Sequence, residues 1–349
     1  MYNPPHYGTT PLLPPSSADI QNLFGPQSDV LHAYSLCYQE QERLTEVGAE
    51  TEPLIHIRVL GWIFVFSPTS PMLDDLTVAV VSCNGISHKY NGLGKFCVDF
   101  WIRTFRKYKG QTPKPTGHVS RPSFDKVVDM IAVELQPYPD DHSSAKKNAL
   151  IRDGFRCVLS GVYDMKSYQT INEVKAEVDG GSGFTGTTQC AHIFSSSTNS
   201  DISGNDKERF SHRSVFEELT GTGIHRLENV FTLHTDYHDL FDTLQLWFEP
   251  TPEDNHYKVG TSQPVIFRRV PREVTFKNNH FVNEDDTPVL PMPSKEYLSL
   301  HAACAKVANM SGAAEYLEDL DREREEGKTL AADGSSMPLF ANVLWDAVK

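Results

Sequence analysis

Four short fragments carry side chains that could perform hydrolytic chemistry. They are, in order, Cys157-Val-Leu-Ser-Gly161, Cys190-Ala-His-Ile193, Leu227-Glu-Asn-Val-Phe-Thr-Leu233 and His238-Asp-Leu-Phe-Asp242. His192 lies in a short apolar run typical of a strand, where a neutral imidazole can accept a proton from water near neutral pH. We therefore take His192 as the candidate general base. The alternative is a histidine that is hydrogen-bonded inside the core.

His238 and Asp242 form a second candidate pair. They are four residues apart in a segment that we predict to be a helix over 235–242, so their side chains project from one face. An imidazole and a carboxylate in this arrangement can bind the same cation. A simple ion pair between the two side chains would explain the spacing equally well.

Taken together, the four fragments resemble the fungal HNH endonuclease family. In that family a Cys-x-x-[Ser/Thr]-Gly strand leads to an Ala-His-Ile strand, and an Asn-x-x-x-Leu segment precedes a helix with His-x-x-Phe-Asp. The interval of nine residues between Asn229 and His238 matches this pattern, and ordered fragments at a fixed interval are more specific than any one of them. The resemblance covers about a third of the chain and implies a ββα-metal fold within residues 143–260.

The resemblance implies a metal-dependent endonuclease that hydrolyses phosphodiester bonds of nucleic acid, with DNA as the first expectation. One divalent cation would be bound at His238 and Asp242, with Mg²⁺ or Mn²⁺ expected before Zn²⁺ or Ni²⁺. His192 would deprotonate a water molecule, and the cation would neutralise the charge that develops on the phosphate and on the leaving 3′ oxygen.

Further residues take their expected roles from the same resemblance. Asn229 would either bind the metal or hold the loop that bears His192, whereas its structural alternative is a turn-forming asparagine. Arg226 or Arg156 could steady the phosphate, although either could equally be an ordinary surface residue. Many HNH nucleases have Asp or His as a metal ligand just before the general base, but this chain has Ala191. Alanine cannot bind metal.

The charge balance restricts how nucleic acid could be bound. The 349 residues carry a net charge of −14, which excludes a protein whose whole surface binds phosphates. Contact must therefore be local, and the best basic cluster for it comprises Arg103, Arg106, Lys107, Lys109 and Lys114, with Phe105 and Tyr108 interleaved. A solvated, positively charged helix end is the alternative explanation of this cluster.

Six cysteines occur without a Cys-x-x-Cys pair, so we expect free thiols rather than a disulfide framework. A zinc ion at Cys157, Cys190 and His234 is a weaker alternative. The sequence shows neither a signal-like start nor a run long enough to span a bilayer, and we expect an intracellular location, cytoplasmic or nuclear.

The patterns predict an α+β protein in which the HNH domain is flanked by a mostly helical N-terminal region and a C-terminal strand-plus-helix region. We expect a disordered arm over 1–27, the helical region over 28–142, the HNH domain over 143–260, and the C-terminal region over 261–349 with an acidic helix at 314–328. Residues 54–66 fit either a strand or a short helix. Strands are predicted at 189–194, 244–249, 264–270 and 272–282, and helices at 122–136, 143–153, 206–219 and 294–310.

A different class of function competes with the enzyme. The same domain could be a catalytically silent or repurposed scaffold, acting as an interaction or regulatory module, or it could act on a substrate other than nucleic acid. The acidic balance and Ala191 favour the scaffold. The presence of His192, Asn229 and His238 together favours the enzyme, because packing alone does not need these polar groups.

Overall fold

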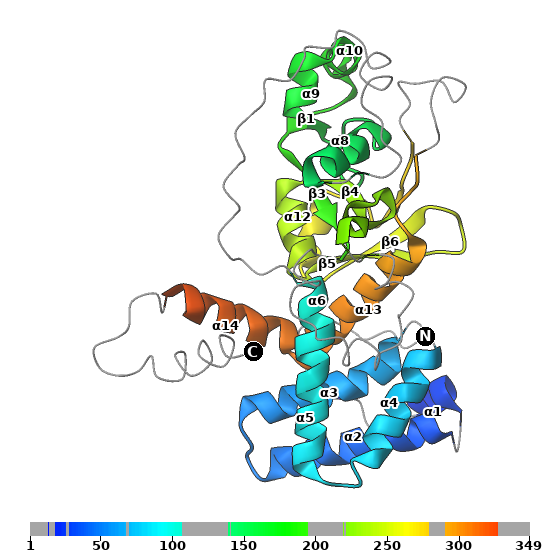
Figure 1. The fold of residues 1–349 in the computed structure, drawn as a ribbon, viewed down its shortest axis with the longest axis vertical. Helices are drawn as coiled ribbons and strands as arrows, with labels where there is room; N and C mark the ends of the chain where they lie inside the picture. Colours follow the sequence, from blue (N-terminus) through cyan, green and yellow to red (C-terminus); the bar gives the residue numbers. More distant parts are fainter. Residues whose placement is uncertain are drawn as a thin grey trace.

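The computed structural model describes residues 13, 18–25, 28–67, 70–106, 139, 141–194, 219, 221–278 and 290–326. Helices form one end of the molecule, and small sheets with further helices form the other (Figure 1). This mixture of helices and small sheets is an α+β fold. The predicted helix at 122–136 and all but the last residue of the predicted helix at 206–219 lie outside the described residues.

The helical end is built around one buried helix, α3. Its elements are α1 (Ala18–Phe24), α2 (Asp29–Glu46), α3 (Thr51–Phe66), α4 (Ser70–Ser82), α5 (Ser87–Cys97), a π-helical turn (Val98–Ile102) and α6 (Arg103–Phe105). α3 is apolar on nearly every side because it packs against α2, α5 and α13 (Lys295–Ser311). The run 54–66 is therefore part of a helix, and its lack of amphipathic periodicity reflects burial all round.

The N-terminal arm departs from the expectation of disorder over residues 1–27. Residues 18–24 form α1, and Ile20 is completely buried. Leu13 is also buried, and its backbone N–H donates to Oε1 of Gln41 at 2.8 Å. Leu13 packs so closely on α3 that a Cβ added at Gly61 would lie 2.4 Å from it. A few apolar residues thus anchor a segment whose average composition is that of a flexible arm.

The central hairpin is covered by one helix on each face. β3 (Thr188–His192) pairs antiparallel with β4 (Val230–His234), so that His192 lies opposite Val230 and Thr188 opposite His234. Cys190 and Val230 pack with Ala149 and Leu150 of α8 (His142–Arg152). On the other face Ala191, Phe231 and Leu233 join the core that contains Phe241 of α12 (Thr235–Asp242). Successive residues of each strand therefore pack against opposite helices.

The remaining strands form two small sheets. β1 (Tyr163–Asp164) pairs parallel with β2 (Thr185–Gly186), next to α9 (Met165–Thr170), α10 (Asn172–Glu177) and a π-helical turn (Val178–Ser182). β5 (Leu246–Pro250), β6 (His256–Thr261) and β7 (Glu273–Thr275) form an antiparallel sheet. The boundary expected at residue 260 falls inside β6. The strand predicted at 264–270 is wrong, because Pro264–Arg268 is a 3₁₀ helix.

The C-terminal helices join the two ends of the molecule. α13 packs against both α3 and β5, and α14 (Ala313–Glu326) follows it and projects to one side (Figure 1). The helix predicted at 294–310 is α13. Ser294 caps it through its hydroxyl, and Gly312 ends it in the left-handed conformation at φ 84°. In the described part of the chain, no helix has both the length and the apolar character needed to cross a membrane.

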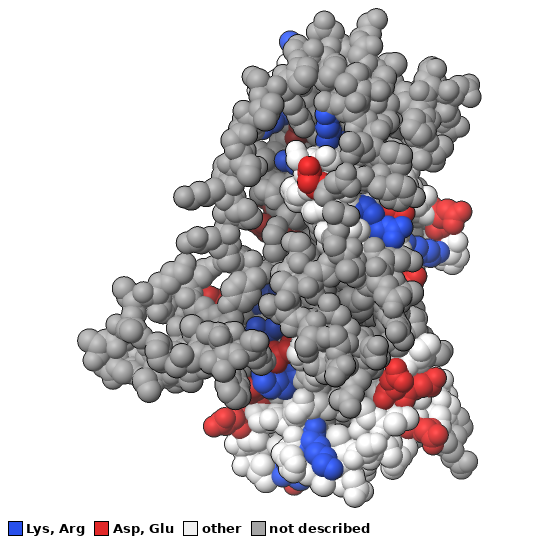
Figure 2. Space-filling model, viewed as in Figure 1, with Lys and Arg blue, Asp and Glu red and all other residues white. Residues whose placement is uncertain are grey.

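The expected basic cluster is not a free positive surface where the structure describes it. Arg103 contacts Asp99 at 3.2 Å, and Arg106 contacts Asp321 of α14 at 2.9 Å with its side chain 8% exposed. Phe105 is buried and packs on Phe194. The other expected members, Lys107, Tyr108, Lys109 and Lys114, lie outside the described residues. Acidic and basic side chains are mixed over the described part of the face drawn in Figure 2.

Candidate functional site

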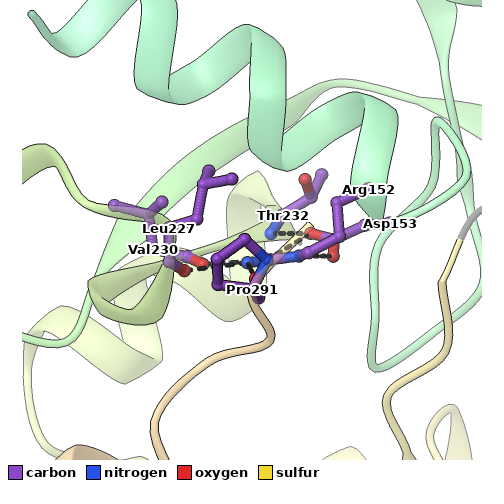
Figure 3. A network of polar contacts seen from close by, with 6 residues as sticks. All are labelled: Arg152, Asp153, Leu227, Val230, Thr232 and Pro291. Atoms are coloured by element: carbon purple, nitrogen blue, oxygen red, sulfur yellow. Dashed lines mark hydrogen bonds and ion pairs between the residues drawn. The ribbon is translucent and has the colours of Figure 1, made fainter. Parts of the chain in front are cut away.

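A buried ion pair fixes α8 against the central hairpin. Arg152 and Asp153 contact each other at 2.8 Å with side chains no more than 1% exposed. The Arg152 guanidinium donates to the carbonyl oxygens of Leu227, Val230 and Pro291, and Oδ2 of Asp153 accepts the N–H of Thr232 at 2.7 Å (Figure 3). Because the other bonds of the pair go to the backbone of other segments, the pair sets the position of α8 relative to β4.

The motif Cys157–Gly161 forms a tight turn beside the same strand. The N–H of Gly161 donates to the carbonyl of Cys157, and Gly161 has a φ of 72°, which favours glycine. The N–H of Val158 donates to the carbonyl of Thr232 in β4 at 3.0 Å. The turn therefore explains why the fragment contains a glycine, and its hydrogen bond to Thr232 adds a contact to the hairpin.

Asn229 joins the two segments that lead to the site. Its side chain accepts the N–H of Phe194 at 2.9 Å and donates to the carbonyls of Phe194 at 3.0 Å and Ile224 at 2.9 Å. Asn229 is completely buried. These are the contacts of a residue that positions backbone, which was one of the two roles left open by the sequence.

His192 ends β3 among other imidazoles. Its Nε2 lies 3.4 Å from Nδ1 of His225, and its ring stacks on that of His142 with centroids 5.4 Å apart. His142 is the first residue of α8, and His225 ends a 3₁₀ helix (Gly221–His225). Burial lowers the pKa of His225, while the nearby Asp141 carboxylate opposes that shift. The lowered pKa favours a neutral His225 at neutral pH.

His238 and Asp242 lie together on α12, as predicted from their spacing. Nε2 of His238 is 3.4 Å from Oδ2 of Asp242, and Nδ1 lies 2.5 Å from Oε1 of Gln189 in β3. His238 is 4% exposed. Because Gln189 offers a carbonyl oxygen, Nδ1 of His238 must carry the proton of this hydrogen bond. A neutral His238 then directs its Nε2 lone pair toward a carboxylate.

The hairpin lies between these two groups of residues. Gln189 and Ala191 face α12, whereas Cys190 belongs to the α8 face, and His192 follows Cys190 by two residues. His192 contacts His142 and His225, and His238 contacts Gln189 and Asp242. The convergence of His192 with His238 that a shared site requires stays a prediction. Phe241 packs on Phe231, which pairs with Ala191. α12 thus runs from Gln189 toward the pair of Ala191 and Phe231, in the direction of the end of β3 that bears His192.

The two candidate arginines already have protein partners. Arg226 makes two hydrogen bonds with the Glu228 carboxylate, at 3.2 and 3.1 Å, and both side chains are about one quarter exposed, at 25% and 27%. Nη1 of Arg156 is 3.4 Å from the Tyr163 hydroxyl. A phosphate would have to compete with Glu228 for Arg226, so a role in phosphate binding stays a prediction for both arginines.

The alternative zinc site is not assembled. All six cysteines are buried free thiols, and Cys157 and Cys190 belong to separate apolar clusters. His234 instead caps α12, accepting the N–H of Asp236 at Nδ1. Within the described ranges, no group of three or more His, Cys, Asp or Glu residues is arranged to hold a metal ion.

Three residues of this region were not predicted from the sequence: Gln189, His142 and His225. Gln189 is two residues from Ala191 on the same strand face, so period-two alternation could have identified it once β3 was predicted. His142 and His225 gave no such signal, because they come from segments 50 and 33 residues away from His192 (192 − 142 and 225 − 192). Only the tertiary fold brings them together.

Comparison with known protein families gives a match over part of the chain. No curated protein and no solved structure matches the chain. Residues 157–249, about a quarter of the sequence, match the family model described as HNH endonuclease. The match begins at Cys157 and includes the hairpin, Asn229 and α12. The stretch from the turn at Cys157 to strand β5 is therefore similar to an HNH endonuclease domain.

Proposed function

We propose that this protein is a metal-dependent HNH endonuclease that hydrolyses phosphodiester bonds of nucleic acid, with DNA as the first substrate to test. The observation that carries this proposal is the match of residues 157–249 to the HNH endonuclease family, because His192, Asn229 and His238 all lie within it. In this proposal β3, β4 and α12 are the ββα-metal unit. The Ala-His-Ile form of β3 further suggests the fungal subgroup of the family.

The chemistry of His238 and Asp242 fits a divalent cation. An Nε2 lone pair and a carboxylate oxygen 3.4 Å apart repel one another unless a proton or a cation lies between them. Gln189 holds the other imidazole nitrogen, which is how proteins commonly orient a metal-binding histidine. A bound Mg²⁺ or Mn²⁺ would neutralise charge on the phosphate and on the leaving oxygen.

His192 is the proposed general base. It lies at the end of β3, which is also the end toward which α12 runs from His238 to Asp242. A phosphate bound at this end of the hairpin could approach both groups. Asn229 has a positioning role in this mechanism, because it holds Phe194, two residues after His192, and Ile224, one residue before His225.

Cleavage and a soaked crystal test the proposal together. Purified protein should nick or cut DNA or RNA with Mg²⁺, Mn²⁺, Ni²⁺ or Zn²⁺, and should be inactive in a chelator. A crystal soaked in Mn²⁺ should show anomalous density between His238 and Asp242. Cleavage that persists in His238→Ala and Asp242→Asn, or Mn²⁺ bound elsewhere, would contradict the assigned metal site.

The scaffold is the second candidate. It is favoured by the net charge of −14, by Ala191 at the usual ligand position, and by the pairing of Arg226 with Glu228. A scaffold would cleave neither single-stranded nor double-stranded substrates with any of the four cations. It would also show no density at His238, so the same two experiments separate the candidates.

A further inference from the structure

Three imidazoles from separate segments form a compact cluster at the end of β3. His142, His192 and His225 have ring centroids 5.4, 5.6 and 6.3 Å apart. His142 stacks on His192 with an interplanar angle of 20°, whereas His225 is edge-on to both rings. His142 lies outside the stretch that matches the HNH family. His142 is therefore a member of the cluster that the family match does not include.

The contact between His192 and His225 joins two ring nitrogens. Two neutral imidazoles can share a hydrogen bond at 3.4 Å only if one nitrogen carries hydrogen and the other offers a lone pair. The tautomers of the two rings are therefore coupled. Two charged rings would both be donors at this contact and would repel each other.

The surroundings of His225 favour a neutral ring, which is able to accept a hydrogen bond. Burial keeps its pKa below the ordinary value, so its ring is neutral under conditions in which the enzyme would work. Asp141, which caps α8, is the charged group that acts on His225, and it also accepts the N–H of Ser144 at 2.8 Å. The neighbouring Arg226 is paired with Glu228. Because a neutral imidazole has one ring nitrogen with a lone pair, and Nδ1 is the His225 nitrogen that lies toward His192, a neutral His225 can accept a hydrogen bond there.

We propose that His225 is a positioning residue for His192: its Nδ1 accepts the Nε2–H of His192 and so makes Nδ1 of His192 the basic atom. This inference rests on the proposed nuclease function and deepens it. His142 covers the face of the His192 ring and limits its rotation. The arrangement resembles other enzymes in which a third group holds a catalytic histidine in one tautomer and stabilises its charged form.

In the proposed step, one bond to phosphorus forms and one breaks. Nδ1 of His192 takes a proton from water, the water oxygen bonds to phosphorus, and the bond to the leaving 3′ oxygen breaks. That oxygen takes a proton from solvent. His192 is then an imidazolium whose Nε2–H still points at the neutral His225, and it returns to its starting form by releasing the Nδ1 proton to solvent.

Nitrogen NMR of the full-length protein, with ¹⁵N-labelled histidine, tests the tautomer directly. At a pH where the rings are neutral, His192 should give the spectrum of the Nε2–H form. His225→Leu removes the acceptor and should produce a mixture of tautomers, whereas His225→Asn keeps an acceptor oxygen and should restore the Nε2–H form. His88→Leu, at an exposed histidine of α5, is the matched control and should leave the His192 signals unchanged.

Cleavage provides the second readout. We expect His225→Leu to lower the rate by about tenfold to hundredfold, as the loss of an orienting partner does in other sites, and to alter the acidic limb of the pH–rate profile. His225→Asn should recover most of the rate. An Nδ1–H tautomer of His192 in the wild type, or equal rates and profiles for His225→Leu and wild type, would overturn the inference. The NMR test needs no substrate, so it decides the inference even for a preparation that cleaves nothing.

Discussion

The side chain of Asn229 makes two hydrogen bonds with the backbone of Phe194. It accepts the Phe194 N–H at 2.9 Å and donates to the Phe194 carbonyl at 3.0 Å. A third bond, to the carbonyl of Ile224, places His225 as well. One amide therefore fixes the exit of the strand that bears His192 and the turn that bears its imidazole partner.

Replacing Asn229 should harm both stability and activity. Asn229→Ala leaves the buried backbone groups of Phe194 and Ile224 without partners, and each such group costs about 1–3 kcal/mol. We expect urea unfolding to show a loss of about 3 kcal/mol in the free energy of unfolding. Asn229→Asp keeps the acceptor for Phe194 but loses both donated bonds, so it should not rescue the fold. An unchanged unfolding free energy for Asn229→Ala would show that the three bonds do not hold the site.

The ion pair of Arg152 and Asp153 should matter more than any exposed pair. Arg152→Met removes the cation from a buried carboxylate and the donor from three carbonyl oxygens, which should cost about 3–5 kcal/mol. Arg156→Met, at a partly exposed arginine four residues later, should cost less than about 1 kcal/mol. Chemical denaturation of the two variants compares them. Similar losses would refute the bridging role of Arg152.

The residues around the hairpin show which features of the fold and of the site could be predicted from the sequence. The helix at 235–242 and the facing of His238 and Asp242 follow from local periodicity, and the structure has both. Because α3 is buried on all sides, its sequence has no amphipathic period, and the helix could not be distinguished from a strand. The anchoring of Leu13 on Gly61, and the meeting of His142 with His192, depend on the packing of distant segments, which no local pattern encodes.

A buried histidine should make the protein sensitive to mild acid. His301 stacks on Phe241 with centroids 3.8 Å apart, and burial lowers its pKa to about 3. An unfolded chain binds a proton at this residue near pH 6.5, whereas the folded chain does not until about pH 3. The contribution to stability is therefore complete above about pH 6.5 and falls as pH decreases, by about 1.4 kcal/mol per unit below that value.

Urea unfolding at pH 7.5, 6.5 and 5.5 measures this effect. His301→Leu should reduce the loss of unfolding free energy between pH 6.5 and 5.5, and His88→Leu should not. The comparison stops at pH 5.5 so that titration of ordinary carboxylates contributes little. The same pH slope in wild type and His301→Leu would assign the acid sensitivity to other groups.

Ala191 offers a gain-of-function test of the proposed cation site. Ala191 is completely buried on the face toward α12, so Ala191→Asp should destabilise the apoprotein by burying a charge. If a cation is bound at His238 and Asp242, Mn²⁺ should reverse much of this loss by mass action and raise the melting temperature more than in wild type. Ala191→Asn, of similar size but neutral, should be destabilised with a smaller response to Mn²⁺. Equal Mn²⁺ responses in both variants would place the cation elsewhere.

The central claim is that His192 activates water in this domain. The most direct test compares metal-dependent cleavage by wild type with cleavage by His192→Ala. Wild type, His192→Ala and His88→Ala should be purified in parallel, so that contaminating nucleases affect all three equally, and their melting temperatures should be compared first. We predict that wild type and His88→Ala cleave DNA or RNA at similar rates with a divalent cation, and that His192→Ala is slower by about 10²–10⁴ with its fold intact. Equal cleavage by wild type and His192→Ala, or no cleavage by any of them with Mg²⁺, Mn²⁺, Ni²⁺ or Zn²⁺, would contradict the claim.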